Sequence, residues 1–186
     1  MNRIKYILLT AALTVSALPL MAQRQRVSPH ETISAVIDGN KVTIVYGRPY
    51  SKDPRSGEIR KIWGTLVPYG KVWRTGADEA TLLTTEQPIV MGTTTIPAGT
   101  YSLFTVPAAD GTAKLVVNKK TGQWGIPYNE KNEATNELAR IDMKKSTLDK
   151  SVDQFTMAIE KGPAGGGEIR MMWETTRFAM PFTVKK

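Results

Sequence analysis

The chain has 186 residues, with 25 Lys and Arg against 17 Asp and Glu, one His, no Cys and a formal net charge of +8. The lack of cysteine excludes disulfide frameworks, thiolate metal sites and thiol nucleophiles, and a single histidine excludes His-rich metal centres. A hydrophobic content of 41% and a mean hydropathy of −0.26 suit a folded domain and exclude a polytopic membrane protein.

The first 22 residues have the pattern of a secretory signal peptide. Arg3 and Lys5 precede the apolar run Tyr6–Leu13, and small residues follow up to Ala22. A basic start, an apolar stretch and a small residue at the exit are typical of such signals. We therefore predict cleavage after Ala22 and export to the periplasm or the outside of the cell. Without cysteine the chain cannot be lipid-anchored there, and no membrane span remains after cleavage.

The rest of the chain, residues 23–186, is dominated by apolar–polar alternation with a period of two, which predicts strands. In chain order the candidate strands are Thr32–Ile37, Lys41–Tyr46, Ala80–Thr85, Pro88–Met91, Thr94–Ile96, Thr100–Val106, Lys114–Asn118, Glu137–Lys144, Phe155–Glu160, Ile169–Trp173 and Phe178–Val184. We expect about nine or ten short strands among them, with little helix.

Turn signals separate these strands. Asp38-Gly39-Asn40 predicts a hairpin, and Pro97-Ala98-Gly99 predicts a turn that leads into the strand containing Tyr101. A short turn or helix is expected through Ala134, and Glu174–Arg177 is interpreted as the turn of a final hairpin. Closely spaced short strands of this kind predict a single all-β domain, a β-sandwich or jelly roll.

The positive charge is concentrated in one segment. Removing residues 1–22 leaves 23 basic and 17 acidic residues, and Arg48–Arg74 alone holds seven basic residues against Asp53 and Glu58. Aromatic residues and turn formers are interleaved with these charges. Loops on a rigid scaffold commonly carry binding groups, and arginine pairs well with carboxylate, sulfate or phosphate.

This pattern predicts a binding site in which Arg48 and Arg74 hold an anionic group while Trp63, Tyr69 or Trp73 stacks on a ring, with Trp124 nearby. The alternative is that the tryptophans fill the core and the basic side chains are solvated. Export argues against nucleic acid as the partner. An envelope glycan or a small anion suits the segment better.

Catalytic and metal-binding signals are few. Asp78 and Glu79 are adjacent, so in an extended chain they point to opposite faces and cannot act on one substrate together. His30 is the one side chain with an ordinary pKa near neutrality. A hydrolase that uses Asp78 or Glu79 with His30 therefore remains an alternative. No pattern indicates a metal site or a cofactor.

Six strings of this sequence resemble a family of exported bacterial proteins catalogued as domain of unknown function 2911. They are Tyr46-Gly47-Arg48-Pro49, Lys61-Ile62-Trp63-Gly64, Leu66-Val67-Pro68-Tyr69-Gly70, Trp73-Arg74-Thr75-Gly76-Ala77, Ala98-Gly99-Thr100-Tyr101-Ser102-Leu103-Phe104 and Gln123-Trp124-Gly125. The resemblance covers about residues 28–184. It implies a single exported domain and no established activity. The stretch between Pro49 and Ile62 is longer than the family pattern, so the resemblance assigns no role to Lys52 or Arg55.

The favoured hypothesis is thus a non-catalytic binding module of the cell envelope for a glycan or small anionic ligand. The hydrolase is one alternative, and a purely structural or interaction domain of the envelope is the other. The sequence does not determine the oligomeric state.

Overall fold

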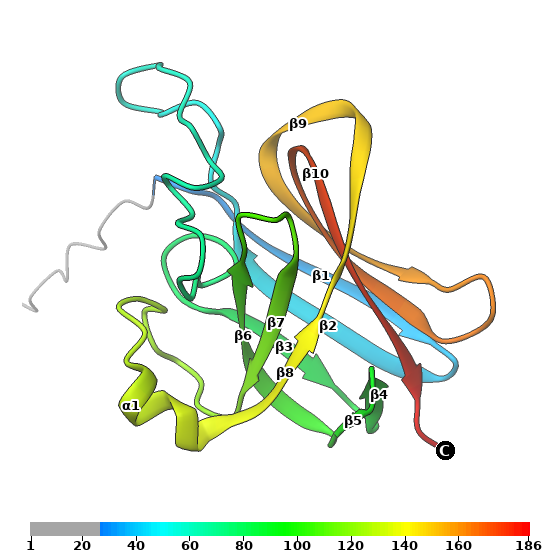
Figure 1. Cartoon of the computed structure of the whole chain (residues 1–186). Coiled ribbons are helices and arrows are strands. Elements are labelled where there is room, and N and C mark those ends of the chain that lie inside the picture. Colours follow the sequence, from blue (N-terminus) through cyan, green and yellow to red (C-terminus); the bar gives the residue numbers. More distant parts are fainter. Residues whose placement is uncertain (1–26) are drawn as a thin grey trace, which may run out of the picture.

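The structure is a computed structural model that describes residues 27–186. Within these residues ten strands form two sheets, and the strand pairs within each sheet are antiparallel (Figure 1). The all-β sandwich predicted from the sequence is confirmed. The predicted signal peptide, residues 1–22, lies outside the described residues. No helix in the described part is long and apolar enough to cross a membrane.

The larger sheet has six strands in the order β1-β2-β3-β6-β7-β8. They are β1 (His30–Ile37), β2 (Asn40–Gly47), β3 (Thr81–Thr85), β6 (Gly99–Pro107), β7 (Ala113–Asn118) and β8 (Glu137–Asp142). The predicted first hairpin is confirmed, with Asp38 and Gly39 at positive φ. The predicted short helix is present as α1 (Glu130–Glu133), followed by the 3-10 turn η1 (Ala134–Asn136), in the connection between β7 and β8.

The smaller sheet has four strands in the order β5-β4-β10-β9. They are β4 (Ile89–Met91), β5 (Thr94–Ile96), β9 (Lys144–Lys161) and β10 (Gly167–Val184). The two 18-residue strands β9 and β10 form a long ribbon, drawn from yellow to red, that crosses the molecule in Figure 1. This ribbon supplies most of one layer of the sandwich.

The predicted turn at Glu174–Arg177 is wrong, because β10 runs through it without a break. The register against β9 shifts between Met172 and Glu174 and again between Glu174 and Thr176, and Glu174 has a φ of 51°. Such bulges change which alternate residues face inward. Trp173 and Phe178 are therefore both buried although their positions differ in parity. In the sequence, the apolar positions change from odd to even numbers between Trp173 and Phe178. Either a turn or a bulge can cause this change, and here it is a bulge.

Apolar side chains of both sheets pack in one core. Tyr46 of β2 belongs to this core and links the two sheets by hydrogen bonds. Its hydroxyl donates to Glu31 Oε2 at 2.7 Å and accepts from the backbone N–H of Met157, in β9, at 3.0 Å. Burial raises the pKa of Tyr46 to about 12, and the neighbouring Glu31 carboxylate acts in the same direction. The phenol therefore stays neutral and keeps both hydrogen bonds.

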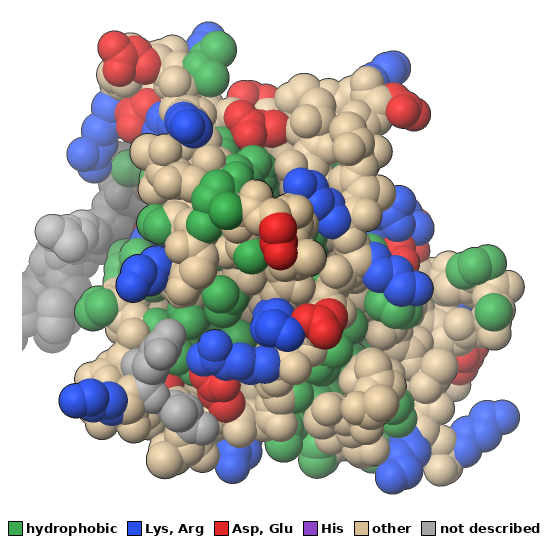
Figure 2. Space-filling view, in the orientation of Figure 1, with side chains coloured by type: hydrophobic (Ala, Val, Ile, Leu, Met, Phe, Trp, Pro, Cys, Tyr) green, Lys and Arg blue, Asp and Glu red, His purple; other side chains and the backbone are tan. Residues whose placement is uncertain are grey.

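The basic segment lies in the long connection between β2 and β3, residues 48–80, which contacts both sheets. At one end Phe155 of β9 donates its N–H to Pro49 O at 2.9 Å. At the other end Trp73 and Thr105 of β6 exchange two backbone hydrogen bonds of 2.8 Å. On the face seen in Figure 2, Lys and Arg side chains are scattered among Asp, Glu and hydrophobic side chains.

Replacing Tyr46 with Phe tests the link between the sheets. Tyr46→Phe leaves the buried N–H of Met157 without its acceptor, so we expect a loss of about 1–3 kcal/mol in the free energy of unfolding. Urea denaturation followed by tryptophan fluorescence measures it. Tyr69→Phe is the matched control, because Tyr69 is 43% exposed. Equal stability of the two variants would contradict this role of Tyr46.

Candidate functional site

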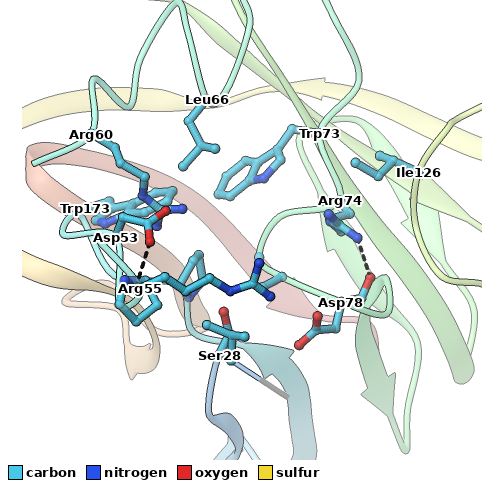
Figure 3. Close-up of a pocket in the computed structure, with 15 residues that line it drawn as sticks. Ser28, Asp53, Arg55, Arg60, Leu66, Trp73, Arg74, Asp78, Ile126 and Trp173 are labelled. Carbon is cyan, nitrogen blue, oxygen red and sulfur yellow. Dashed lines mark hydrogen bonds between the residues drawn. The ribbon is translucent and has the colours of Figure 1, made fainter. Parts of the chain in front are cut away.

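A cavity of about 360 Å³ opens beside Trp73, where the connection between β2 and β3 passes over the end of the sandwich (Figure 3). We call it the Trp73 cavity. Its lining comes from segments far apart in the chain: Val27, Ser28, Pro49, Asp53, Pro54, Arg55, Arg60, Leu66, Trp73, Arg74, Gly76, Ala77, Asp78, Ile126 and Trp173. The size falls in the usual range for small-molecule sites, about 300–1,000 Å³.

Two indole rings belong to the apolar part of this cavity, beside aliphatic side chains such as Leu66 and Ile126. Trp73 and Trp173 stack with their ring centroids 5.9 Å apart and an interplanar angle of 20°. Phe155 meets both rings edge to face, and Trp63 does the same from another side. Trp73 is 8% exposed and Trp173 only 1%, so both rings belong mainly to the core. The rings therefore act as core side chains and still border the cavity.

Three arginines border the same space. Arg74 Nη1 donates to Asp78 O at 2.7 Å and to Trp124 O at 3.4 Å. Burial lowers the pKa of the Arg74 guanidinium, and the carboxylates of Asp78 and Glu79 oppose that shift. Because an arginine pKa starts above 12, the group remains a cation.

The other two arginines come from the loop after Tyr50. Arg60 donates from Nη2 to Tyr50 O, while its buried Nε has no acceptor among the described residues. Arg55 is exposed, and in Figure 3 its side chain extends across the cavity toward Asp78. With Asp53 and Asp78 as the acidic members, the lining carries one more positive charge than negative.

The loop that carries Arg74 and Asp78 has an unusual backbone. Thr75 and Asp78 have φ values of 57° and 64°, which are unfavourable for residues with a side chain. A Cβ atom at Gly47 would clash with the Ala77 carbonyl, and one at Gly76 would lie 2.6 Å from Gly47 O. The end of β2 and this loop therefore need both glycines to approach each other. Strained backbone of this kind is often found at functional sites.

His30 lies beside the acidic pair although it is 48 residues away in the chain. Its Nε2 is 3.2 Å from Asp78 Oδ2 and 3.5 Å from Glu79 Oε2. The fold thus brings together the three residues of the predicted hydrolase alternative. Asp78 lines the Trp73 cavity, whereas His30 and Glu79 line a neighbouring cavity together with Tyr46.

The six residues predicted to bind a ligand are divided among different places. Trp73 and Arg74 line the Trp73 cavity, and Trp124 lines a separate one. Trp63 and Tyr69 border a third cavity on the side of Phe178.

Arg48 lies elsewhere, in the contact between the sheets. It donates to Phe155 O at 3.2 Å and to Thr156 Oγ1 at 2.9 Å, and it pairs with Glu31 Oε2 at 3.1 Å. Each of these partners belongs to a strand, so the side chain of Arg48 serves the fold.

Sequence reasoning missed Trp173 and Arg60 as lining residues. Trp173 sits in an alternating apolar run and was expected to be core, which it also is. Nothing in the chain signals that it meets Trp73, because that contact depends on how the sheets pack. Arg60 carries a weak signal as a member of the basic segment.

No group of three or more His, Asp or Glu side chains in the described part of the chain is placed to hold a metal ion. In the loop Asp53–Glu58, Asp53 Oδ1 accepts a hydrogen bond from the backbone N–H of Arg55 at 2.8 Å. This hydrogen bond lowers the pKa of Asp53.

Comparison with known proteins gives one family. No curated protein and no solved structure matches the chain significantly. A family model described as "Protein of unknown function (DUF2911)" matches residues 28–182, a span that includes the Trp73 cavity lining except Val27. The chain therefore belongs to the DUF2911 family.

Proposed function

We propose that this protein is an exported, non-catalytic binding module of the cell envelope, and that the Trp73 cavity holds a small ligand that has a ring with an apolar face and an anionic group. Acidic sugars, alone or in a glycan, have this chemistry. The signal-peptide pattern of residues 1–22 supports export.

The observation that carries the proposal is the stacked pair of Trp73 and Trp173 beside three arginines in one cavity. The part of the Trp73 indole that reaches the cavity can contact the apolar face of a ring, and a guanidinium binds carboxylate, sulfate or phosphate. Arg60 Nε is a buried donor with no acceptor among the described residues. Such a donor is costly to leave unpaired, and an anionic ligand would satisfy it.

Charge limits the class of ligand. The lining has Arg55, Arg60 and Arg74 against Asp53 and Asp78. The excess of one positive charge favours a ligand with a single negative charge over a polyanion. The two aspartates also offer acceptors for hydroxyl groups, which a sugar carries around its ring.

Arginine variants test the anion site. Glucuronic acid and small anions should raise the melting temperature of the wild-type protein. Arg55→Ala should weaken glucuronic acid binding about tenfold or more in calorimetry, because a charged hydrogen bond is lost. Arg74→Ala should weaken it further. Lys71→Ala, from the same segment but outside the cavity lining, is the matched control and should bind as the wild type does.

Two results would contradict the binding module. The first is that no acidic sugar or small anion stabilises the wild type. The second is that Arg55→Ala and Lys71→Ala bind equally well. In the first case the structural or interaction domain of the envelope becomes the better account.

A hydrolase is the second candidate, because His30 Nε2 lies 3.2 Å from Asp78 Oδ2 at the edge of the cavity. In glycoside hydrolysis one carboxylic acid protonates the leaving oxygen and a second carboxylate activates water or attacks the sugar. Asp78 would protonate the leaving oxygen of a ligand in the Trp73 cavity, with His30 orienting its carboxylate, and Asp53, the other carboxylate of the lining, would activate the attacking water.

The hydrolase makes its own prediction. Wild-type protein should release 4-nitrophenol from its β-glucuronide, and Asp78→Asn should lower the rate by a factor of about 10²–10⁴ because the acid–base group is lost. Glu58→Gln is the matched control, since Glu58 is an exposed carboxylate of the same connection and lies outside the cavity lining. Absence of release by the wild type, or equal rates in the two variants, would contradict it.

A further inference from the structure

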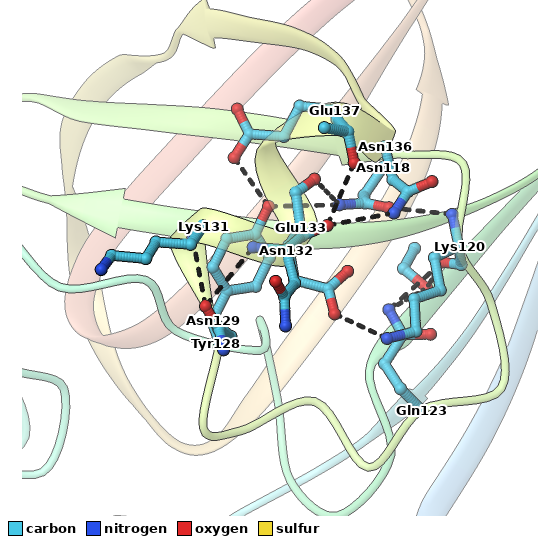
Figure 4. A network of polar contacts seen from close by, with 12 residues as sticks. Asn118, Lys120, Gln123, Tyr128, Asn129, Lys131, Asn132, Glu133, Asn136 and Glu137 are labelled. Carbon is cyan, nitrogen blue, oxygen red and sulfur yellow. Dashed lines mark hydrogen bonds and ion pairs between the residues drawn. The ribbon is translucent and has the colours of Figure 1, made fainter.

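A second cavity, of about 180 Å³, lies beside Trp124 in the connection between β7 and β8. We call it the Trp124 cavity. The rings of Phe104, Trp124 and Tyr128 contribute to its apolar lining together with Ile126 and Pro127. Its polar groups come from Lys120, Gln123 and Glu133, which Figure 4 shows from close by.

Two oxygen atoms at this cavity are buried and lack donors. Glu133 is 8% exposed; its Oε1 accepts from Lys120 Nζ at 2.6 Å, and its Oε2 has no partner among the described residues. Gln123 donates from Nε2 to Ser102 Oγ at 3.2 Å, and its Oε1 is likewise without a donor. Buried acceptors are rarely left unpaired, so the pair indicates a ligand that donates hydrogen bonds.

The surrounding network holds these groups in place. Asn118 donates to Tyr128 OH at 3.1 Å and to Glu133 O at 3.3 Å, and Tyr128 donates to Glu137 Oε1 at 2.6 Å (Figure 4). Burial and the hydrogen bond to Glu137 raise the pKa of Tyr128. A site built in advance loses little freedom when a ligand binds.

The charge of the Trp124 cavity is balanced. Lys120 and Glu133 form an ion pair, and the remaining lining residues are neutral. A cationic ligand would compete with Lys120 for the carboxylate. Neutral hydroxyl donors suit the two free acceptors better, and the aromatic rings suit the apolar face of a sugar.

The two cavities lie on either side of the short segment Trp124–Ile126. Ile126 lines both of them. Gly125 lies directly over Arg74, because a Cβ atom there would be 2.7 Å from Arg74 Cβ. Trp124 and Ile126 are 53% and 40% exposed, so the ridge between the cavities presents apolar side chains. The shared lining residue Ile126 makes the two cavities neighbours along this segment.

We propose that the Trp73 and Trp124 cavities are neighbouring subsites for one acidic oligosaccharide. The acidic sugar lies in the Trp73 cavity against the arginines. The adjoining neutral sugar lies in the Trp124 cavity and donates its hydroxyl groups to Glu133 Oε2 and Gln123 Oε1. This pairing of subsites rests on the proposed function. It adds that the ligand has at least two rings, an acidic sugar followed by a neutral one.

The test compares a one-ring probe with a two-ring probe by calorimetry. The probes are glucuronic acid and a disaccharide of glucuronic acid and N-acetylglucosamine. Wild-type protein should bind the disaccharide about tenfold tighter or more, because the second ring adds contacts at little entropic cost. Glu133→Gln replaces a carboxylate oxygen with an amide and should abolish most of this advantage.

Trp124→Ala is a second variant of the same subsite. Because the Trp124 side chain is 53% exposed, we expect this substitution to disturb folding less than Glu133→Gln does. It too should reduce the ratio of the two affinities toward one. Glu86→Gln, at an exposed position that lines neither cavity, is the matched control and should keep the wild-type ratio. Melting curves show whether each variant is folded.

The outcomes separate the two proposals. If the wild type binds glucuronic acid but gains nothing from the second ring, the pairing of subsites is wrong and the binding module stands. An advantage that survives both Glu133→Gln and Trp124→Ala also overturns the pairing. If neither probe binds to the wild type, both proposals fail for acidic sugars.

Discussion

The stacking of Trp73 on Trp173 is the contact on which the site and the sandwich both depend. Trp73 is fixed to β6 by its two backbone hydrogen bonds with Thr105, and Trp173 belongs to β10 in the other sheet. Their contact therefore joins the layers, and stacked aromatic pairs contribute about 0.5–1.5 kcal/mol beyond their buried area. The same rings border the Trp73 cavity. The two rings are thus core side chains that also border a cavity, so the core position predicted for the tryptophans and a place at the proposed site are compatible.

A second constraint sets the geometry around these rings. The approach of Gly47 to the Thr75–Asp78 loop leaves no space for a side chain on β2 at that point. The loop adopts positive φ at Thr75 and Asp78, and the Thr81 hydroxyl donates a hydrogen bond to Thr75 O at 2.7 Å. This conformation turns Asp78 toward both His30 and the cavity. The fold thus holds Thr75 and Asp78 at φ values that residues with side chains disfavour. Such conflicts between local conformational preference and the fold are expected at functional sites.

Much of the fold follows from the alternation of residues, because a period of two fixes which side chains face the core. Turn residues add the first hairpin around Gly39 and the turn at Pro97-Ala98-Gly99, where Tyr101 OH donates to Pro97 O at 3.0 Å. Alternation does not distinguish a bulge from a turn, so the prediction of a turn at Glu174 is wrong in the middle of β10. It also says nothing of which loops meet. The partnership of His30 with Asp78, and of Trp73 with Trp173, arises only when the sheets pack.

The same limit applies to the charges, because the sequence cannot separate arginines that hold the fold from those that can bind. Arg48 uses its donors on Glu31, Phe155 O and Thr156. Arg60 and Arg74 are each tied to a backbone carbonyl while bordering the cavity. A guanidinium held at one edge is already ordered, so it loses little entropy when its other edge meets an anion. The basic segment is therefore not a uniform surface for binding polyanions, because its arginines have different structural roles. It is a scaffold that orients a few cations beside two indole rings.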